Sequence, residues 1–161
     1  MNSSKGIIFI GSVGAGKSTQ GKLVAEVVGK RSILLDDIMN RYFEVTGFNW
    51  SQFAEIKKSD GFLAAYQQLK PSEAYAARQV VKDYPNCVID FGAGHSHYRD
   101  NSLFEGVKEA MSGCTNVILL LPSPNLDHSI SVLRHRSNQQ RGWNWIADGY
   151  DFIETLDRRR L

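Results

Sequence analysis

The sequence has little net charge, few cysteines and no long apolar run, and each of these absences excludes a class of protein. Its 19 Lys and Arg residues against 17 Asp and Glu leave a net charge of +2, which is too small to indicate a nucleic-acid partner. Cys87 and Cys114 stand in apolar surroundings without the spacing of metal ligands, so we expect reduced thiols in the core. No apolar run approaches the roughly 20 residues of a membrane span, and the start Met-Asn-Ser-Ser-Lys does not fit a signal peptide. We therefore expect a cytoplasmic protein with no membrane and no nucleic-acid partner.

What the sequence does contain is a regular alternation of short apolar runs and helical patterns. Its 161 residues predict a single domain, 1–161, without internal repeats or a low-complexity linker. Predicted buried strands occupy residues 7–10, 32–35, 87–90 and 117–121. Helical apolar spacing marks residues 22–28, 38–45, 103–111 and 127–136, and residues 48–84 are predicted to form irregular helices that Pro71 interrupts. This alternation predicts an α/β fold of three layers (αβα), with helices on both faces of a parallel sheet.

The first apolar run leads into a G-x-x-x-x-G-K-[ST] motif at residues 11–18, which is typical of a phosphate-binding loop. Its glycines let consecutive backbone N–H groups point at phosphate oxygens, and the following helix adds the positive end of its dipole. Lys17 is expected to reach the β- and γ-phosphates, and the Ser18 hydroxyl to ligate Mg²⁺. The predicted nucleotide-binding residues are Gly11, Val13, Gly14, Ala15, Gly16, Lys17, Ser18 and Thr19. The motif therefore predicts that the protein binds a nucleoside triphosphate.

Taken over nearly its whole length, the chain resembles the small P-loop kinases of metabolites, and within them it is most similar to shikimate kinase. The likeness includes carboxylates after the second strand, a glycine-rich turn after the third and two arginines seven residues apart after the fourth. These residues are Asp36, Asp37, Gly92, Ala93, Gly94, Arg134 and Arg141. The resemblance implies the strand order 2-3-1-4, ATP and Mg²⁺ as cofactors, an acceptor-side helical region at about 40–84 and a lid at about 134–149.

The same resemblance suggests roles for these residues. Asp36 would orient the acceptor hydroxyl and accept its proton, and Asp37 would help to hold the water shell of Mg²⁺; alternatively, both only cap the next helix. Asp90, which closes a buried strand beside the phosphate loop, would bind Mg²⁺ through water. The turn Gly92-Ala93-Gly94 would contact the acceptor together with Asp36.

The basic segment after the fourth strand supplies the lid. Arg134 would lie over the adenine ring, and Arg141 would swing onto the transferring phosphate as a catalytic residue beside Lys17 and Asp36. Arg136 is equally compatible with a solvated helix end.

On the acceptor side the sequence departs from shikimate kinase. Leu63 stands where the family has an arginine that grips the substrate carboxylate, and leucine cannot make that contact. Arg78 is a candidate replacement for this anion clamp, although its helix also needs solvated residues. His95 and His97 follow the glycine-rich turn and could face the acceptor, but we expect histidines on a loop to be solvated. The sequence thus predicts an acceptor other than shikimate.

These observations favour an ATP-dependent kinase that phosphorylates a hydroxyl of a small metabolite, acting as a monomer or homodimer. One alternative is a nucleoside or nucleotide kinase, because residues 88–92 also resemble that group. Another is a degenerate nucleotide-binding module with weak ATPase activity. A regulatory GTPase is disfavoured, because the sequence has no Asn-Lys-x-Asp guanine motif.

Related kinases have a fifth strand, but no apolar run after Leu121 is long enough to form one. The strand at 117–121 would then lie at an open sheet edge, which invites pairing unless something covers it. Residues 150–157, a second subunit or a continuation of the natural chain beyond residue 161 could provide the cover. We favour the continuation, and expect phosphates to supply most of the nucleotide affinity of this form.

Overall fold

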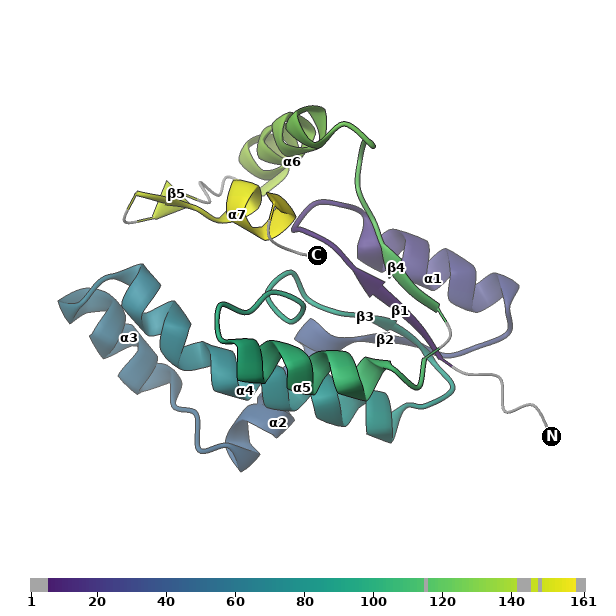
Figure 1. The fold of residues 1–161 in the computed structure, drawn as a ribbon, viewed down its shortest axis with the longest axis horizontal. Helices are drawn as coiled ribbons and strands as arrows, with labels where there is room; N and C mark the ends of the chain where they lie inside the picture. Colours follow the sequence, from purple (N-terminus) through teal and green to yellow (C-terminus); the bar gives the residue numbers. More distant parts are fainter. Residues whose placement is uncertain (1–5, 115, 142–145, 148, 159–161) are drawn as a thin grey trace.

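A four-stranded parallel sheet forms the centre of the computed structural model, which describes residues 6–114, 116–141, 146–147 and 149–158. Its strands are β1 (Ile7–Ile10), β2 (Ser32–Leu34), β3 (Val88–Asp90) and β4 (Asn116–Leu119). They follow the order β2-β3-β1-β4 (Figure 1), and Ile7 of β1 is in register with Val88 on one side and with Asn116 on the other. The predicted strand order 2-3-1-4 is confirmed.

Helices cover both faces of this sheet, as the alternation of strands and helices predicted. The described helices are α1 (Lys17–Val27), α2 (Leu35–Val45), α3 (Trp50–Ser59), α4 (Phe62–Asp83), α5 (Asn101–Met111), α6 (Leu126–Arg141) and α7 (Phe152–Arg158), of which α1 lies on one face of the sheet and α2, α4 and α5 on the other. Side chains alternate along each strand. Ile8 and Ile89 therefore enter the main core formed with α2, α4 and α5, whereas Phe9 and Val88 pack with Ala25 of α1 on the other face. The three-layer αβα architecture is confirmed.

Helix α2 begins earlier than the sequence predicted, and this changes the position of the two carboxylates. The helix starts at Leu35 instead of at residue 38, so Asp36 and Asp37 lie in its first turn and not in a loop after the strand. The cap residue is Leu34, which makes no side-chain capping bond. Two negative charges in the first turn are favourable because they face the positive end of the helix dipole.

Helix α4 runs without a break through Pro71, where the sequence predicted an interruption. A proline inside a helix removes one backbone hydrogen bond and costs about 3 kcal/mol or more. Around Pro71, however, α4 packs against α2, α3 and α5, and Leu69 and Ala74 are buried in these contacts. The packing of a long helix outweighs the local penalty, which apolar spacing alone did not reveal.

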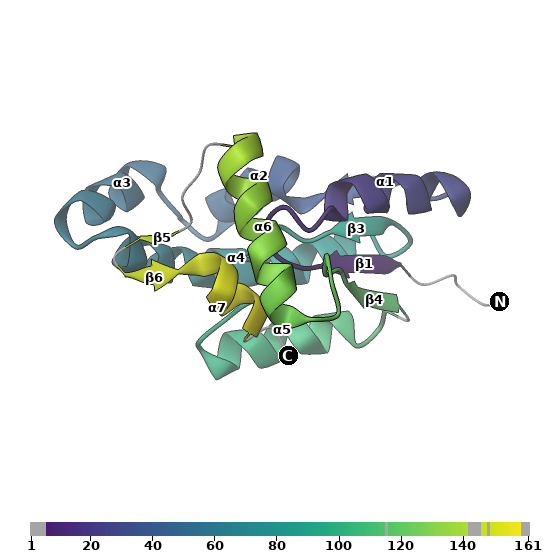
Figure 2. The same ribbon diagram turned by 90° about the horizontal axis from the view of Figure 1, so that it is seen from above.

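The C-terminal part of the chain packs over the phosphate loop. A short antiparallel pair, β5 (Ile146–Ala147) and β6 (Tyr150–Asp151), leads into α7, which packs against α6. Figure 2 shows α6 crossing above the end of the sheet with α7 beside it. Val13 and Ala15 of the loop form a small core with Ile130, Leu133 and Ile153 of these two helices.

Strand β4 pairs with β1 and lies at the edge of the sheet, as predicted. Val117 and Ile118 stay 40% and 37% exposed. In the described part of residues 150–157, α7 packs chiefly against α6, and the principal contacts of this segment do not include β4. Cys87 and Cys114 carry free thiols, but they are half-buried at the margin of the main core and not inside it. Among the described residues, no helix combines the length and the apolar character needed to cross a membrane.

Candidate functional site

The loop between β1 and α1 has the backbone of a phosphate-binding loop. Gly11, Gly14 and Gly16 have positive φ angles of 148°, 77° and 98°, a region that side-chain-bearing residues rarely adopt. At Gly11 an added Cβ would lie 2.6 Å from the carbonyl oxygen of Leu120, so the loop can pass the neighbouring chain only as glycine. Gly16 directly precedes α1, so the loop opens onto the N-terminus of that helix.

Three polar side chains meet at the mouth of this loop. The Ser18 hydroxyl donates a hydrogen bond of 2.6 Å to Oδ2 of Asp90, the last residue of β3. The buried Lys17 ammonium donates to the carbonyl oxygen of Ser12 at 3.1 Å. Burial raises the pKa of Asp90 above its usual value, although the positive charge of Lys17 and the hydrogen bond from Ser18 lower it.

A cavity of about 220 Å³ opens in front of these groups, and we call it the phosphate-loop cavity. It is lined by Val13, Gly14, Gly16, Lys17, Ser18, Thr19, Asp36, Asp90 and Ala93. The other carboxylate oxygen of Asp90, Oδ1, is buried and has no hydrogen-bond partner among the described residues. A hydroxyl and a carboxylate with a spare oxygen are ligands that Mg²⁺ accepts alongside water and phosphate oxygens, so the residues present fit the predicted cation. The part of the chain that is described holds no group of three or more acidic, His or Cys side chains able to bind a metal alone.

A second cavity, of about 320 Å³, adjoins the first, and we call it the aromatic cavity. Its lining is largely apolar and comes from the phosphate loop, α2, α3, α4, the turn after β3 and α7; the residues are Val13, Asp36, Met39, Phe43, Phe53, Phe62, Tyr66, Leu69, Glu73, Ala93, Gly94, His95 and Phe152. Val13, Asp36 and Ala93 line both cavities. Asp36 is 64% exposed, whereas the exposed Asp37 is not among the described residues that line either cavity. Of the two neighbouring carboxylates, the structure places Asp36 in the site.

The turn after β3 is tightly packed against two carboxylates. A Cβ on Gly92 would lie 1.9 Å from Oδ1 of Asp36, and a Cβ on Gly94 would lie 2.5 Å from Oε1 of Glu73. A side chain at either position would force the neighbouring carboxylate to move, so the turn Gly92-Ala93-Gly94 can lie this close to both carboxylates at the wall of the aromatic cavity because these two positions are glycine.

The two histidines after this turn are buried, which corrects the expectation that they are solvated. Their exposed fractions are 2% for His95 and 3% for His97. Nδ1 of His95 lies 3.7 Å from Oδ1 of Asp36, and neither ring nitrogen of His95 has a hydrogen-bond partner within the described chain. Burial lowers the pKa of His95, against the opposite effect of the charges on Glu73 and Asp36. One signal in the sequence could have indicated the burial of these histidines: they directly follow a glycine-rich turn that closes a buried strand.

The sequence analysis missed a buried ion pair in α4. The Lys70 ammonium donates to Oε2 of Glu73 at 2.6 Å and to the carbonyl oxygen of Gly94 at 3.0 Å. It also lies 4.2 Å from the ring centroid of Tyr66. Lys and Glu three residues apart on a helix are typical of a solvated face, so only the packing of α4 could reveal that this pair is buried.

The predicted lid arginines have different surroundings. Arg134 makes ion pairs with Asp151 and Glu154 of the C-terminal segment, and its Nη2 lies 2.9 Å from Oε2 of Glu154. Arg136 donates to the carbonyl oxygen of Gly14 at 3.0 Å, which places it directly on the phosphate loop. The side chain of Arg141, together with residues 142–145 and 148 of the predicted lid, lies outside the described part of the structure. The roles of Arg134 and Arg141 stay predictions.

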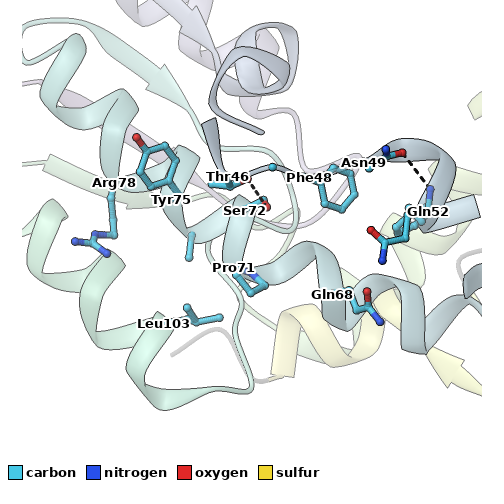
Figure 3. A pocket seen from close by; sticks show the side chains of 13 residues that line it. Thr46, Phe48, Asn49, Gln52, Gln68, Pro71, Ser72, Tyr75, Arg78 and Leu103 are labelled. Carbon is cyan, nitrogen blue, oxygen red and sulfur yellow. Dashed lines mark hydrogen bonds between the residues drawn. The ribbon is translucent and has the colours of Figure 1, made fainter. Parts of the chain in front are cut away.

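Arg78, the candidate anion clamp, lies elsewhere. It lines a third cavity of about 430 Å³, between the end of α2, α3, α4 and α5, together with Thr46, Gln68, Ser72 and Leu103. Figure 3 shows this cavity, with the hydrogen bond between its lining residues Thr46 and Ser72. The described lining of the phosphate-loop and aromatic cavities does not include Arg78, so this residue does not supply the missing clamp there.

Comparison with known proteins supports the resemblance. No family model matches the chain. It is 35% identical over 95 residues to a shikimate kinase of Nitrosomonas europaea, a match that covers 59% of this chain and 40% of that protein. The matched part of the chain therefore spans less than half the length of this relative.

Solved structures show the same fold over almost the whole chain. A shikimate kinase from Acinetobacter baumannii in complex with shikimate matches 98% of this chain and 73% of its own, with a TM-score of 0.58 and 16% identity. A shikimate kinase from Bacteroides thetaiotaomicron matches 96% of this chain and 74% of its own, with a TM-score of 0.52 and 23% identity. A gluconokinase from Sinorhizobium meliloti matches 98% of this chain and 73% of its own, with a TM-score of 0.50 and 17% identity. The chain thus resembles shikimate kinase in sequence and has the fold of small P-loop kinases.

Proposed function

We propose that this chain transfers the γ-phosphoryl group of ATP to a hydroxyl of a small metabolite, in the presence of Mg²⁺. The observation that carries the proposal is the position of Asp36, which lines both the phosphate-loop cavity and the aromatic cavity. A carboxylate at this junction can contact a hydroxyl held in one cavity while that hydroxyl faces a phosphate held in the other. Positioning of this kind is the main contribution that a protein makes to phosphoryl transfer.

The nucleotide half of the reaction depends on the phosphate loop. Backbone N–H groups between Gly11 and Lys17 would surround the phosphates, and the Lys17 ammonium would leave the carbonyl of Ser12 for their β- and γ-oxygens. Ser18 and Asp90 would hold Mg²⁺, which supplies charge neutralisation on the phosphate oxygens when bound. Arg134 would contact adenine and Arg141 the transferring phosphate, as the family resemblance implies.

The acceptor half depends on Asp36 and the turn at Gly92, Ala93 and Gly94. The acceptor oxygen would form the new bond to the γ-phosphorus while the bond from this phosphorus to the β–γ bridging oxygen breaks, and ADP leaves with that electron pair. The Asp36 carboxylate would take the hydroxyl proton. Residues 40–84 would enclose the acceptor, and the segment at 134–149 would close over the nucleotide as a lid.

Steady-state ADP release, measured with and without a panel of hydroxylated metabolites, tests this proposal. We expect at least one compound to accelerate ADP release and to appear as a phosphorylated product, and we expect Lys17→Ala to abolish both signals. ADP release that no compound accelerates would instead identify a nucleotide-binding module with weak ATPase activity.

A further inference from the structure

The charges around the aromatic cavity limit the kind of acceptor that the site can take. The acidic and basic side chains among its described lining are Asp36, Glu73 and His95, beside the phenol of Tyr66, and this lining includes no Lys or Arg. Because burial lowers the pKa of His95, its imidazole is neutral near pH 7 and adds no positive charge. Lys17 lies on the phosphate-loop side, where its charge faces the nucleotide phosphates. An acceptor with a carboxylate would therefore lose hydration without gaining a cationic partner from the described lining of this cavity.

Lys70, a cation close to the wall of the aromatic cavity, is already part of an ion pair. Lys70 is paired with Glu73, donates a hydrogen bond to the carbonyl oxygen of Gly94 and lies over the ring of Tyr66. Its side chain is only 6% exposed, and Lys70 is not part of the described cavity lining. Taking Lys70 away to bind an anionic acceptor would leave Glu73 buried and unpaired, which is strongly unfavourable.

The rest of the wall is suited to a ring with an apolar face. The rings of Phe62 and Tyr66 both meet Phe152 edge-to-face, with centroid separations of 5.2 Å and 5.1 Å. Phe53 continues this surface, with its ring centroid 6.3 Å from that of Phe62. Flat rings, whether of a base or the C–H face of a cyclic sugar, pack well against such a surface.

We infer that the acceptor is an uncharged, hydroxyl-bearing ring compound, such as a nucleoside or a neutral cyclic sugar, whose ring packs in the aromatic cavity and whose hydroxyl meets Asp36. The inference rests on the proposed function and specifies the acceptor of that same site. It also gives a structural reason why Leu63 can stand where shikimate kinases have an arginine.

Matched pairs of compounds that differ in one carboxylate test the inference. The pairs are methyl shikimate with shikimate, and the methyl ester of methyl glucuronoside with methyl glucuronoside, and several nucleosides extend the uncharged series. Binding in the presence of MgADP is followed by ligand-observed NMR, and turnover by ADP release. We expect the uncharged member of each productive pair to have a kcat/KM roughly tenfold or more above that of its carboxylated partner. Preference for the carboxylated members, or failure of every uncharged compound to bind, would overturn the inference.

A substitution in the wall provides a second, independent measurement. Met39 lines the aromatic cavity, and Met39→Arg would add a cation there, while Met39→Gln adds a neutral polar group of similar length. We expect the arginine variant to shift the kcat/KM ratio toward the carboxylated compounds, whereas the glutamine variant keeps the original preference. An unchanged ratio in both variants would contradict the charge argument.

The two proposals fail in different ways. Acceptor-dependent turnover that favours carboxylates leaves the kinase function standing and overturns only the acceptor class. MgADP binding and binding of uncharged ring compounds, without phosphorylation of any compound, would refute the kinase function while supporting the cavity's preference.

Discussion

Replacing Gly92 by alanine should impair the acceptor half of the site while sparing the nucleotide half. The new Cβ would lie 1.9 Å from Oδ1 and 2.7 Å from Cγ of Asp36, and 2.7 Å from Nδ1 of His95. Ordinary van der Waals contact begins at about 3.4 Å, so the carboxylate must retreat by more than 1 Å. A displacement of about 1 Å in a reacting group can lower the rate roughly 10²-fold, and we expect a loss of kcat of this size.

The same substitution should have only a modest effect on stability. Overpacking costs about 1–3 kcal/mol, and the lower end applies here because the exposed Asp36 side chain can swing toward solvent. For a domain of this size, about 1 kcal/mol lowers Tm by roughly 2–4 °C. Gly113→Ala is the matched control, because no atom lies within 4 Å of its added Cβ and its φ is not positive. ADP release, ADP binding by calorimetry and thermal unfolding are measured on both variants. A Gly92→Ala variant with normal kcat, or one whose ADP affinity falls as much as its kcat, would refute the reasoning.

Further predictions concern single side chains in the same region. Asp36→Asn should keep ADP binding and lose roughly 10²–10⁴-fold in acceptor-dependent kcat, whereas the kcat of Asp37→Asn should stay within a few-fold of the wild-type value. A larger loss of kcat in Asp37→Asn than in Asp36→Asn would assign the base to Asp37. Ser18→Ala should raise the Mg²⁺ concentration needed for half-maximal turnover, and an unchanged Mg²⁺ titration would remove Ser18 from the cation site. The pKa of His95 is lower in the folded state than in the unfolded chain, so the unfolded chain binds a proton at this residue more readily. The contribution of His95 to stability is therefore fully present above about pH 6.5 and is lost as the pH falls toward the folded-state pKa. Urea unfolding should therefore show that the free energy of unfolding of the wild type decreases below pH 6.5 by up to about 1.4 kcal/mol per pH unit, more steeply than that of His95→Asn. Parallel pH profiles of the two proteins would contradict the assignment. The charges that face this ring are those of Asp36, Glu73, Lys70 and Lys17.

Much of the fold could be predicted because its signals are local. The four apolar runs gave the strands to within two residues, and the loop motif placed residues 11–18 between strand and helix. The strand order followed from resemblance and not from periodicity. The uninterrupted α4 could not be predicted, because the penalty at Pro71 is local while the packing that outweighs it comes from three other helices.

The nucleotide half of the site could be predicted from local signals, and the acceptor half only in part, through Asp36 and the glycine-rich turn. Lys17 and Ser18 belong to the loop motif, and Asp90 closes the buried strand that precedes the glycine-rich turn. The burial of His95 and the pair Lys70–Glu73 depend on how α4 meets the turn after β3, a contact between segments that are distant in sequence. Apart from the position of His95 directly after the glycine-rich turn, no pattern within either segment distinguishes these polar groups from solvated ones.

The packing of the phosphate loop against the C-terminal helices links ligand affinity to the stability of a distant segment. Val13 and Ala15 pack against Ile130, Leu133 and Ile153, so the folding of α6 and α7 supplies contacts that order the loop. Ordering one backbone residue costs about 1–2 kcal/mol, and folding rather than binding meets that cost for this loop. By mass action, a ligand that requires the ordered loop must also favour the state in which α6 and α7 are docked. Loss of apolar contact at Ile153 should therefore weaken phosphate binding, although this side chain lies behind the loop and is not part of the described lining of the phosphate-loop cavity.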